Sequence, residues 1–443
     1  MGIRAMNRQS GRIAHFFLLG GSATVLFFQL SFLPTVAAET SPRPFILKEL
    51  LREALARNPE LQGARARWEA AKFRISQARS LEDPMIGADV EGIPRGTADI
   101  GKYMDIEYMI SQTIPFPGKL SLKGKMAEQE AKSIYENTRA TEQQLLSEVK
   151  SAFEQLYLVE RSMEVFEHHK DIVEQFSKSA EARYTTGAGT QQDLLKANLE
   201  LSKMANEVLT LRQEREIAVA LLNRLLNRPV YSPLEITVEG AENPAVLDWQ
   251  TIEKRTLSHR PDLLAAESEL HKSKSSASLA KLGYLPDFFT RVEARQYDGE
   301  SRIREYDTFL GVTLPVWFWG KQRAEVKEKE AMVSESEGAM TATKNRVLFE
   351  AKEAFVRAEA KERLVRLYQT AVLPQSEEAL RASRTGYETN RVDFLNLLDT
   401  DRTLRDFELE YYKAVADYHV ALADLERAVG APLEGGDSVV QKK

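Results

Sequence analysis

Few side chains in this chain of 443 residues have the type and spacing that chemistry requires. His168 and His169 are adjacent, so in a helix they would lie on different faces, which disfavours joint metal binding and favours surface or packing roles. The sequence contains no cysteine, which excludes thiol catalysis, thiolate metal sites and disulfides. It also contains no phosphate-binding loop, HExxH motif or nucleophile elbow. The residues therefore predict a protein that is not an enzyme and has neither cofactor nor resident metal.

Three methionines are the remaining candidates for metal chemistry. Met85, Met104 and Met109 fall in segments with strand-like patterns. Thioether sulfur is a soft ligand that suits copper(I). Methionine is also a common packing residue, and we expect lipid-facing or packing roles for all three.

Charge and the amino terminus restrict the location of the protein. The formal net charge is −6, so the chain has no basic surface for nucleic acid. Residues 1–38 have the pattern of a signal peptide: basic residues, an apolar stretch, and Val36-Ala37-Ala38 as a cleavage signal. An uncleaved membrane anchor is the alternative. Beyond residue 40 no apolar run is long enough for a transmembrane helix.

The second half of the chain repeats the first. Pro117-Gly118-Lys119 returns as Trp319-Gly320-Lys321 at an offset of 202 residues, and Leu194-Leu195 returns as Leu397-Leu398 at an offset of 203. We therefore predict one body with an internal twofold repeat. Its parts are a first repeat at 39–246, a second repeat at 247–432 and a polar tail at 433–443.

Each repeat predicts the same order of elements. The expected segments are a helix at 47–80, strands within 83–114 and long helices within 119–227, then a helix at 247–281, strands within 285–316 and long helices within 321–429. A helix over 119–183, which contains no proline, would be on the order of 100 Å long. Helices of this length are typical of coiled coils or helical tubes, and a solvated rod is the alternative. An apolar seam at 4-3-4 spacing supports packing against a neighbour. It comprises Leu145, Val149, Ala152 and Leu156.

The strand segments alternate between apolar and charged residues. Ile106, Tyr108 and Ile110 alternate with Asp105, Glu107 and Met109. This pattern fits either a membrane β-barrel with a wet lumen or half-exposed soluble hairpins. Aromatic residues near the segment ends favour the barrel. Four strands cannot close a barrel in lipid, so a homotrimer with twelve strands is expected.

With this plan, the chain from about Leu47 to Pro432 resembles the TolC family of trimeric outer-membrane efflux channels. The resemblance rests on two turns between long helices. Tyr184-Thr185-Thr186-Gly187 is followed by Asp193, and Tyr387-Glu388-Thr389-Asn390 is followed by Asp393. The joints at 114–119 and 314–321 resemble the branch that exports heavy metals and related cations.

The resemblance implies a fold that is mainly α with a membrane β-barrel continuing into a long helical tunnel. It implies the outer membrane of a Gram-negative bacterium, with a periplasmic extension. The implied partners are outer-membrane lipid, a periplasmic adaptor and an inner-membrane pump of the resistance-nodulation-division type. The implied function is passive conduction of pumped substrates. Alternatives are a duct for type I protein secretion and a non-channel periplasmic scaffold, and the cargo stays open.

The resemblance also implies a gate at the second hairpin tip, where the family has two acidic residues three apart. Those positions are Asn396 and Asp399, so one acidic residue is replaced by an amide, and Asp393 lies nearby. A ring of three carboxylates would favour cations. The residues expected at the closing contacts and at the adaptor docking tips are Asp193, Tyr387, Gly187, Ala188, Asn390 and Arg391. Val392 replaces the arginine expected in the closing contacts.

Overall fold

The computed structural model describes residues 46–93, 96, 103–237 and 248–433. The predicted signal peptide and residues 434–443 of the predicted tail lie outside the described residues. The helices are α1 (Leu47–Arg57), α2 (Pro59–Arg79), α3 (Lys119–Thr185), α4 (Gln191–Leu225), α5 (Trp249–His259), α6 (Pro261–Lys281), α7 (Lys321–Leu367), α8 (Leu373–Glu388) and α9 (Phe394–Val429). The strands are β1 (Met85–Glu91), β2 (Asp105–Ile114), β3 (Asp287–Tyr297) and β4 (Glu305–Thr313), with a short 3-10 turn at Leu282–Tyr284 and a π turn at Tyr368–Val372.

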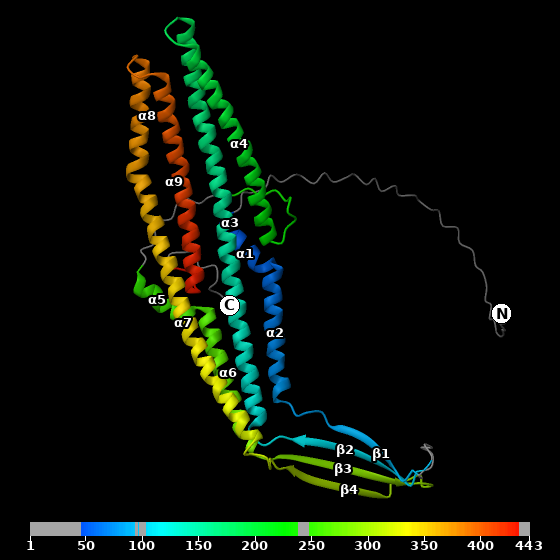
Figure 1. The fold of residues 1–443 in the computed structure, drawn as a ribbon. Coiled ribbons are helices and arrows are strands. Elements are labelled where there is room, and N and C mark those ends of the chain that lie inside the picture. The colour runs from blue at the N-terminus through cyan, green and yellow to red at the C-terminus, as the bar shows by residue number, and fades with distance from the viewer. Residues whose placement is uncertain (1–45, 94–95, 97–102, 238–247, 434–443) are drawn as a thin grey trace, which may run out of the picture. The chain divides into compact units, whose positions relative to one another are not determined.

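Two helical hairpins dominate the body that these elements form. In Figure 1, α4 runs back beside α3 and α9 runs back beside α8. The predicted seam on α3 is confirmed, because all four of its residues are buried. It joins residues of α1 and α4 in one hydrophobic cluster. Packing along this seam stabilises helices that would be marginal as isolated segments.

The helices predicted at 47–80 and 247–281 are each divided into two. The breaks fall at Asn58 and Arg260, which have extended ψ values of 123° and 116°. Each residue precedes a proline, and the proline ring disfavours the helical conformation of the residue before it. Since proline is well placed at the first position of a helix, a new helix starts at once. The prediction of single helices was wrong at these two points.

Asn58 joins three helix ends, two of them through its side chain. Its Oδ1 accepts hydrogen bonds from the backbone N–H groups of Glu60 and Leu61 at 3.0 and 3.1 Å, which caps α2. Its Nδ2 donates to the carbonyl oxygen of Leu225 at 3.1 Å, at the end of α4. The residue also follows the last turn of α1. These contacts align the end of α4 with the start of α2, although the two residues are more than a hundred positions apart in the sequence.

Replacing Asn58 with alanine is expected to lower the free energy of unfolding by about 1–2 kcal/mol, since a helix cap is lost and buried backbone groups lose their partner. Thermal unfolding followed by helical circular dichroism measures the change. Asn206→Ala, at an exposed position within α4, is the matched control. Equal stability of the two variants would contradict the capping role.

The second hairpin contains a local change of helix type. The helix predicted over 321–386 continues through α7 and α8, but residues Tyr368–Val372 form a π turn. Pro374 follows it within the first turn of α8. Proline has no N–H to donate to the preceding turn, and the wider π turn accommodates that loss. On the first hairpin, α3 runs through the corresponding region as one α-helix.

The four strands form one antiparallel sheet in the order β1-β2-β3-β4. Directly paired residues share a face, so the register separates two faces. One face carries Ile86, Val90, Ile106, Ile110, Val292, Leu310 and Val312. The other carries Asp89, Glu91, Asp105, Glu107, Arg291, Glu293, Arg295, Glu305 and Asp307.

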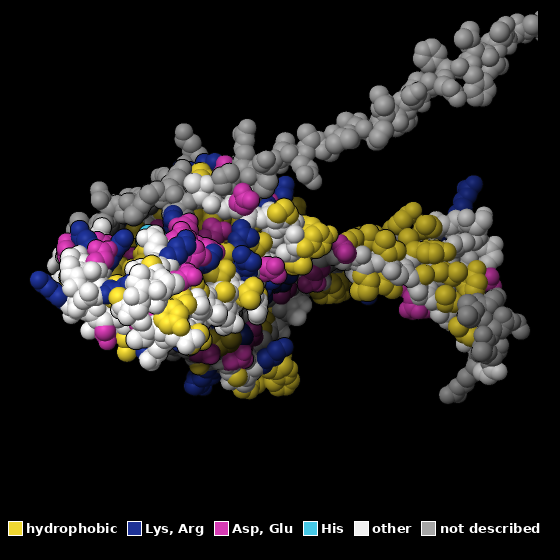
Figure 2. Space-filling model, turned by 90° about the horizontal axis from the view of Figure 1, so that it is seen from above, with side chains coloured by type: hydrophobic (Ala, Val, Ile, Leu, Met, Phe, Trp, Pro, Cys, Tyr) yellow, Lys and Arg dark blue, Asp and Glu magenta, His cyan; other side chains and the backbone are white. Residues whose placement is uncertain are grey.

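The apolar face of the sheet is exposed within this chain. Ile86 and Leu310 are 78% and 77% exposed. Figure 2 shows hydrophobic side chains gathered over the strands. Trp317, Phe318 and Trp319, at the joint after β4, are exposed as well. The alternation predicted from the sequence is therefore present, and it gives the sheet one charged face and one apolar face.

Candidate functional site at the hairpin tips

The first tip is a tight turn closed by backbone hydrogen bonds. Gly187 has a φ of 77°, which a glycine adopts without strain. The N–H groups of Ala188 and Gly189 both donate to the carbonyl oxygen of Arg183, at 2.8 and 2.9 Å. Asp193 then forms a capping box with Thr190 at the start of α4. The carboxylate of Asp193 is thus used to hold the helix start.

The second tip repeats this plan with different residues. Asn390 takes the left-handed conformation with a φ of 59°, a role that asparagine tolerates. Asp393 caps α9 by accepting a hydrogen bond from the N–H of Asn396 at 3.0 Å. Val392 packs against Gly386, where an added Cβ would lie 2.5 Å from Cγ2 of the valine. The resemblance implies an arginine at this position. The apolar side chain of Val392 fills it instead.

Asp399 and Asn396 lie on the first turns of α9, and both side chains are exposed. Their spacing of three residues gives them a common side of the helix. Within the described part of the chain, no hydrogen bond or ion pair reaches the Asp399 carboxylate. A carboxylate in this state is available to solvent and to ions.

Tyr387 connects the two tips. Its ring is buried against Phe394, with the centroids 5.6 Å apart. The guanidinium of Arg183 lies 4.6 Å from the centre of the Tyr387 ring and donates to the Tyr387 carbonyl oxygen at 2.7 Å. Burial raises the pKa of the Tyr387 phenol, Arg183 opposes that shift, and the nearby carboxylate of Asp193 adds to it. The structure thus brings Asp193 and Tyr387 together, with Arg183 as the residue that the sequence did not indicate.

Two buried charge clusters lie further along α9. In the histidine cluster, Nδ1 of His169 lies 2.9 Å from Oδ1 of Asp401, and Nε2 lies 3.2 Å from Oε2 of Glu408. In the glutamate cluster, Glu200 accepts from Arg402 at 2.5 Å and from Arg405 at 3.0 Å. His169 and Asp401 are fully buried, and the Glu200 side chain is 3% exposed.

Sequence reasoning missed both clusters. Burial by itself would lower the pKa of His169, but the hydrogen bonds that its ring donates to Asp401 and Glu408 outweigh burial and raise the pKa to about 9. Hydrogen bonds to Arg402 and Arg405 outweigh the desolvation of Glu200 and hold its pKa below the usual value. The available signal was the 4-and-3 spacing of charged residues at 401, 405 and 408, which is the spacing of a helix seam.

Three carboxylates on the sheet could in principle hold a metal ion. Oxygen atoms of Glu91, Asp105 and Glu107 all lie within 4.8 Å of one another. Arg295 forms ion pairs with Asp105, at 3.3 Å, and with Glu107. The single positive charge of Arg295 is shared between these two acids, and we assign no metal to them. Met85 and Met109 lie on this same charged face of the sheet.

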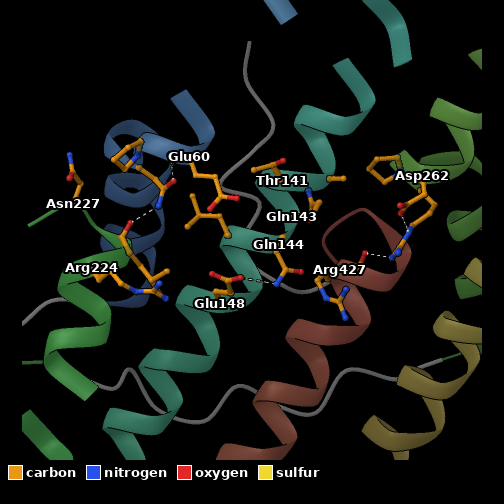
Figure 3. A pocket seen from close by; sticks show the side chains of 16 residues that line it. Glu60, Thr141, Gln143, Gln144, Glu148, Arg224, Asn227, Asp262 and Arg427 are labelled. Atoms are coloured by element: carbon orange, nitrogen blue, oxygen red, sulfur yellow. Dashed lines mark hydrogen bonds and ion pairs between the residues drawn. The ribbon is translucent and has the colours of Figure 1, made fainter. Parts of the chain in front are cut away.

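A cavity of about 680 Å³ lies away from the tips, between the two helix breaks. Figure 3 shows it bordered by α3, by the end of α4 with Arg224 and by the end of α9 with Arg427. Glu60 and Asp262, which start α2 and α6, also line it. Its charges are mixed in sign, and none of the predicted gate or docking residues contributes to it. We interpret the cavity as space left where the two repeats pack against each other.

None of the helices in the described ranges combines the length and the apolar character that crossing a membrane would need.

Comparison with known proteins gives the family. The family described as outer membrane efflux protein matches residues 50–228 and again residues 253–431. The cobalt-zinc-cadmium resistance protein CzcC of Cupriavidus metallidurans is 20% identical over 399 residues, which are 87% of this chain and 90% of the relative. The outer membrane protein OprJ of Pseudomonas aeruginosa is 25% identical over 425 residues, covering 89% and 86%. The outer membrane protein TolC of Vibrio cholerae is 22% identical over 405 residues, covering 87% and 90%.

Solved structures give the same fold. The outer-membrane channel OprN superposes with a TM-score of 0.73 at 19% identity, over 87% of this chain and 90% of that chain. CusC, described as forming a transmembrane channel, superposes with a TM-score of 0.74 at 18% identity, over 87% and 92%. The predicted fold, mainly helical with a four-stranded sheet, is confirmed. By its two family matches, this chain belongs to the outer membrane efflux protein family and is an efflux channel of the bacterial outer membrane.

Proposed function

We propose that three copies of this chain form a passive duct that favours cations and is narrowest at the tip of the second hairpin. The observation that carries the gate is the exposed Asp399 carboxylate on the first turns of α9, which takes part in no hydrogen bond or ion pair within the described residues. Threefold symmetry would gather three such carboxylates around one axis, and a ring of this kind favours cations. The duct carries out no chemistry. The energy for transport comes from an inner-membrane pump of the resistance-nodulation-division type.

Three copies satisfy the open edges of the sheet. Among the residues that the structure describes, strands β1 and β4 each have one unpaired edge, and lipid does not tolerate unpaired backbone groups. Edge pairing between copies would close a barrel of twelve strands with its apolar face outward. Heat-resistant trimers in the outer-membrane fraction are the expected finding. A soluble monomer would contradict the proposal.

The charge of the sheet supports metal cations as cargo. On its charged face, acidic residues outnumber the two arginines, Arg291 and Arg295. This face would line the lumen of the barrel, where it would attract cations. Cobalt, zinc and cadmium, which stand in the name of the relative CzcC, are cations of this class.

The exposed tips support docking of a periplasmic adaptor. Gly187 and Ala188 on the first tip, and Asn390 and Arg391 on the second, are all exposed. The two tips present the same backbone turn with different side chains. An adaptor with its own helical hairpin could contact both. Crosslinking from cysteines placed at Ala188 and Arg391 in this cysteine-free chain would test the contact.

Replacing Asp399 with alanine is expected to abolish most of the cation preference of the duct. Three carboxylates leave the axis together, so block by multivalent cations should weaken roughly tenfold, which corresponds to about 1.4 kcal/mol. Reversal potentials in planar bilayers measure the ion preference, and the fall in conductance on adding trivalent cation measures the block. Asp171→Ala removes an exposed carboxylate from α3 and serves as the control. Unchanged block in the Asp399 variant would rule out the carboxylate ring.

A further inference from the structure

Each repeat joins a strand to a long helix, at 114–119 and at 314–321, but only the first joint is completed within this chain. We propose that the second joint is completed by a second copy, with Lys321 paired to Asp83 of the partner subunit. This inference rests on the proposed trimer and adds to it the residues that both copies contribute where the sheet meets the helices. The experiments below distinguish a wrong contact from a wrong trimer.

The joint between β2 and α3 shows what a completed joint contains. Nζ of Lys119, the first residue of α3, lies 2.8 Å from Oδ1 of Asp287 at the start of β3. The backbone N–H of Phe116 donates to the same oxygen at 2.7 Å, and Nζ of Lys119 also donates to the carbonyl oxygen of Leu285 at 3.3 Å. The Lys119 side chain is only 13% exposed. One carboxylate therefore ties the start of α3 to the strand beside β2.

The joint between β4 and α7 has the same helix start without such an anchor. Lys321 is the first residue of α7, as Lys119 is of α3. Its side chain is exposed, and no hydrogen bond or ion pair reaches its Nζ among the residues that the structure describes. Phe318, which corresponds to Phe116 at the offset of 202, is 52% exposed. Among the four described strands β4 is an outer one, so the place that β3 fills beside β2 is open beside β4.

The sheet aligns the strands of the two repeats residue by residue. Ile110 of β2 and Leu310 of β4 both lie five residues before the first proline of a joint, so these strands align at an offset of 200. Ile110 pairs with Ile86 of β1, and Leu310 pairs with Thr290 of β3. Strand β1 therefore aligns with β3 at an offset of 204.

At this offset, the residues before β1 match those that complete the first joint. Leu81-Glu82-Asp83 aligns with Leu285-Pro286-Asp287, so Asp83 stands in the place of Asp287. Asp83 is exposed, and its carboxylate takes part in no hydrogen bond or ion pair within the described ranges. The chain thus carries both halves of a second anchor, a lysine after β4 and a carboxylate before β1.

The two halves lie on opposite edges of the sheet. Strands β1 and β4 are its outer strands, three strand spacings or about 14 Å apart (Figure 1). In a ring of three copies, β4 of one copy lies beside β1 of the next, and this boundary repeats the arrangement of β2 beside β3. Asp83 of the partner subunit then reaches Lys321 as in the first joint. The exposed ring of Phe318 is covered at the same boundary.

The same alignment fixes the register of the two edge strands. Gln112 of β2 pairs with Thr290 of β3, and the offsets of 200 and 204 turn this pair into Val312 opposite Ile86 of the partner subunit. Both are exposed residues of the apolar face, so apolar side chains meet across the boundary. A slip of one residue would set apolar side chains on the charged face. The ion pair at the helix end of the sheet holds the register against such a slip.

Exchange of the two charges tests the ion pair in the full-length trimer. Lys321→Glu and Asp83→Lys are each expected to lower the ratio of heat-resistant trimer to monomer roughly tenfold, because like charges then meet at all three boundaries. The two changes together restore opposite charges and are expected to recover most of the loss. Denaturing gels of heated and unheated outer-membrane samples measure the ratio. Lys327→Glu is the control, since Lys327 corresponds to the exposed Lys125, which forms no ion pair within the described residues.

Disulfide formation tests the register, because the natural chain contains no cysteine. Opposed residues of neighbouring strands have Cβ atoms about 5 Å apart, close to the spacing that a disulfide needs. Ile86→Cys combined with Val312→Cys is expected to give covalent trimers after oxidation. Ile86→Cys combined with Thr308→Cys moves the second thiol by four residues, or about 13 Å, and is the control.

The results separate the contact from the trimer. Recovery in the double charge variant, with covalent trimers from the first cysteine pair alone, supports the contact. A double variant no more stable than the single ones would overturn the ion pair, and equal crosslinking of both cysteine pairs would overturn the register. If the single charge variants do not assemble at all, the cysteine pair decides, because it leaves both charges in place. If heat-resistant trimers form and none of these changes affects them, the trimer stands and the contact is wrong. If the unmodified protein forms no such trimers, the proposed duct itself fails.

Discussion

Raising the pH from 6 to 10 is expected to remove about 3 kcal/mol of stability through His169 alone. Its pKa rises from 6.5 to about 9 in the folded protein, because burial, which would lower the pKa, is outweighed by the hydrogen bonds donated to Asp401 and Glu408 and by the charges of these acids. A raised pKa means that the stabilisation is fully present below pH 6.5 and is lost as the pH rises through 9. Each unit of pKa corresponds to about 1.4 kcal/mol, which gives the expected size.

The pH experiment compares unfolding free energies of the unmodified protein and of His169→Gln at pH 6, 8 and 10. The groups that face the imidazole are Asp401 and Glu408 of α9, and the glutamate cluster lies beside them. His169→Gln removes the imidazole and leaves these neighbours in place, so the difference between the two proteins reports His169. His168→Gln should keep the full pH dependence. A pH dependence of the same slope in His169→Gln would show that other groups cause it.

Replacing Arg260 with alanine is expected to lower the free energy of unfolding by about 2–3 kcal/mol, since three charge-assisted contacts are lost together. The side chain is nearly buried. Its guanidinium pairs with Asp262 at 2.6 Å and Glu350 at 2.8 Å, and it donates to the carbonyl oxygen of Arg427 at 2.7 Å. One residue thus ties the start of α6 to α7 and to the end of α9. Both acids are one-third exposed, and water would solvate them partly, which limits the loss.

The matched control for Arg260 is Arg346→Ala. Arg346 also pairs with Glu350, at 3.0 Å, but its side chain is 52% exposed. An exposed pair of this kind contributes about 0.5 kcal/mol. Chemical unfolding of the two variants side by side measures the difference. A loss below 1 kcal/mol for Arg260→Ala would show that burial adds nothing at this position.

The strands and the long helices could be predicted from the sequence, because each rests on a local pattern. Alternation at 105–110 marked β2, and the 4-3-4 seam marked α3. The breaks at Asn58 and Arg260 were missed, since a proline within a run of helix-forming residues is compatible with either a kink or a new helix. Local pattern does not decide between them, whereas the hydrogen bond from Asn58 to Leu225 does.

The tips were located from their turn motifs, while the clusters behind them were not. Gly187 and Asn390 mark turns by residue type alone. His169 gives no such signal, because its meaning depends on Asp401 and Glu408, more than two hundred residues away in the sequence. Arg183 was missed for a similar reason: its contacts to Tyr387 join the two hairpins. Long-range charge pairing becomes visible only when α9 lies beside α3.

The π turn at Tyr368–Val372 explains why the two repeats slip by one residue. Before it, Leu156 corresponds to Ala358 at an offset of 202, and after it, Val173 corresponds to Ser376 at an offset of 203. All four side chains are buried. One extra residue in a regular α-helix would rotate everything beyond it by about 100°. The wider π turn accommodates the extra residue, so the same side of the helix stays buried before and after the turn. Over this stretch the hairpin that carries Asp399 is therefore one residue longer than the first hairpin, yet it buries the same face.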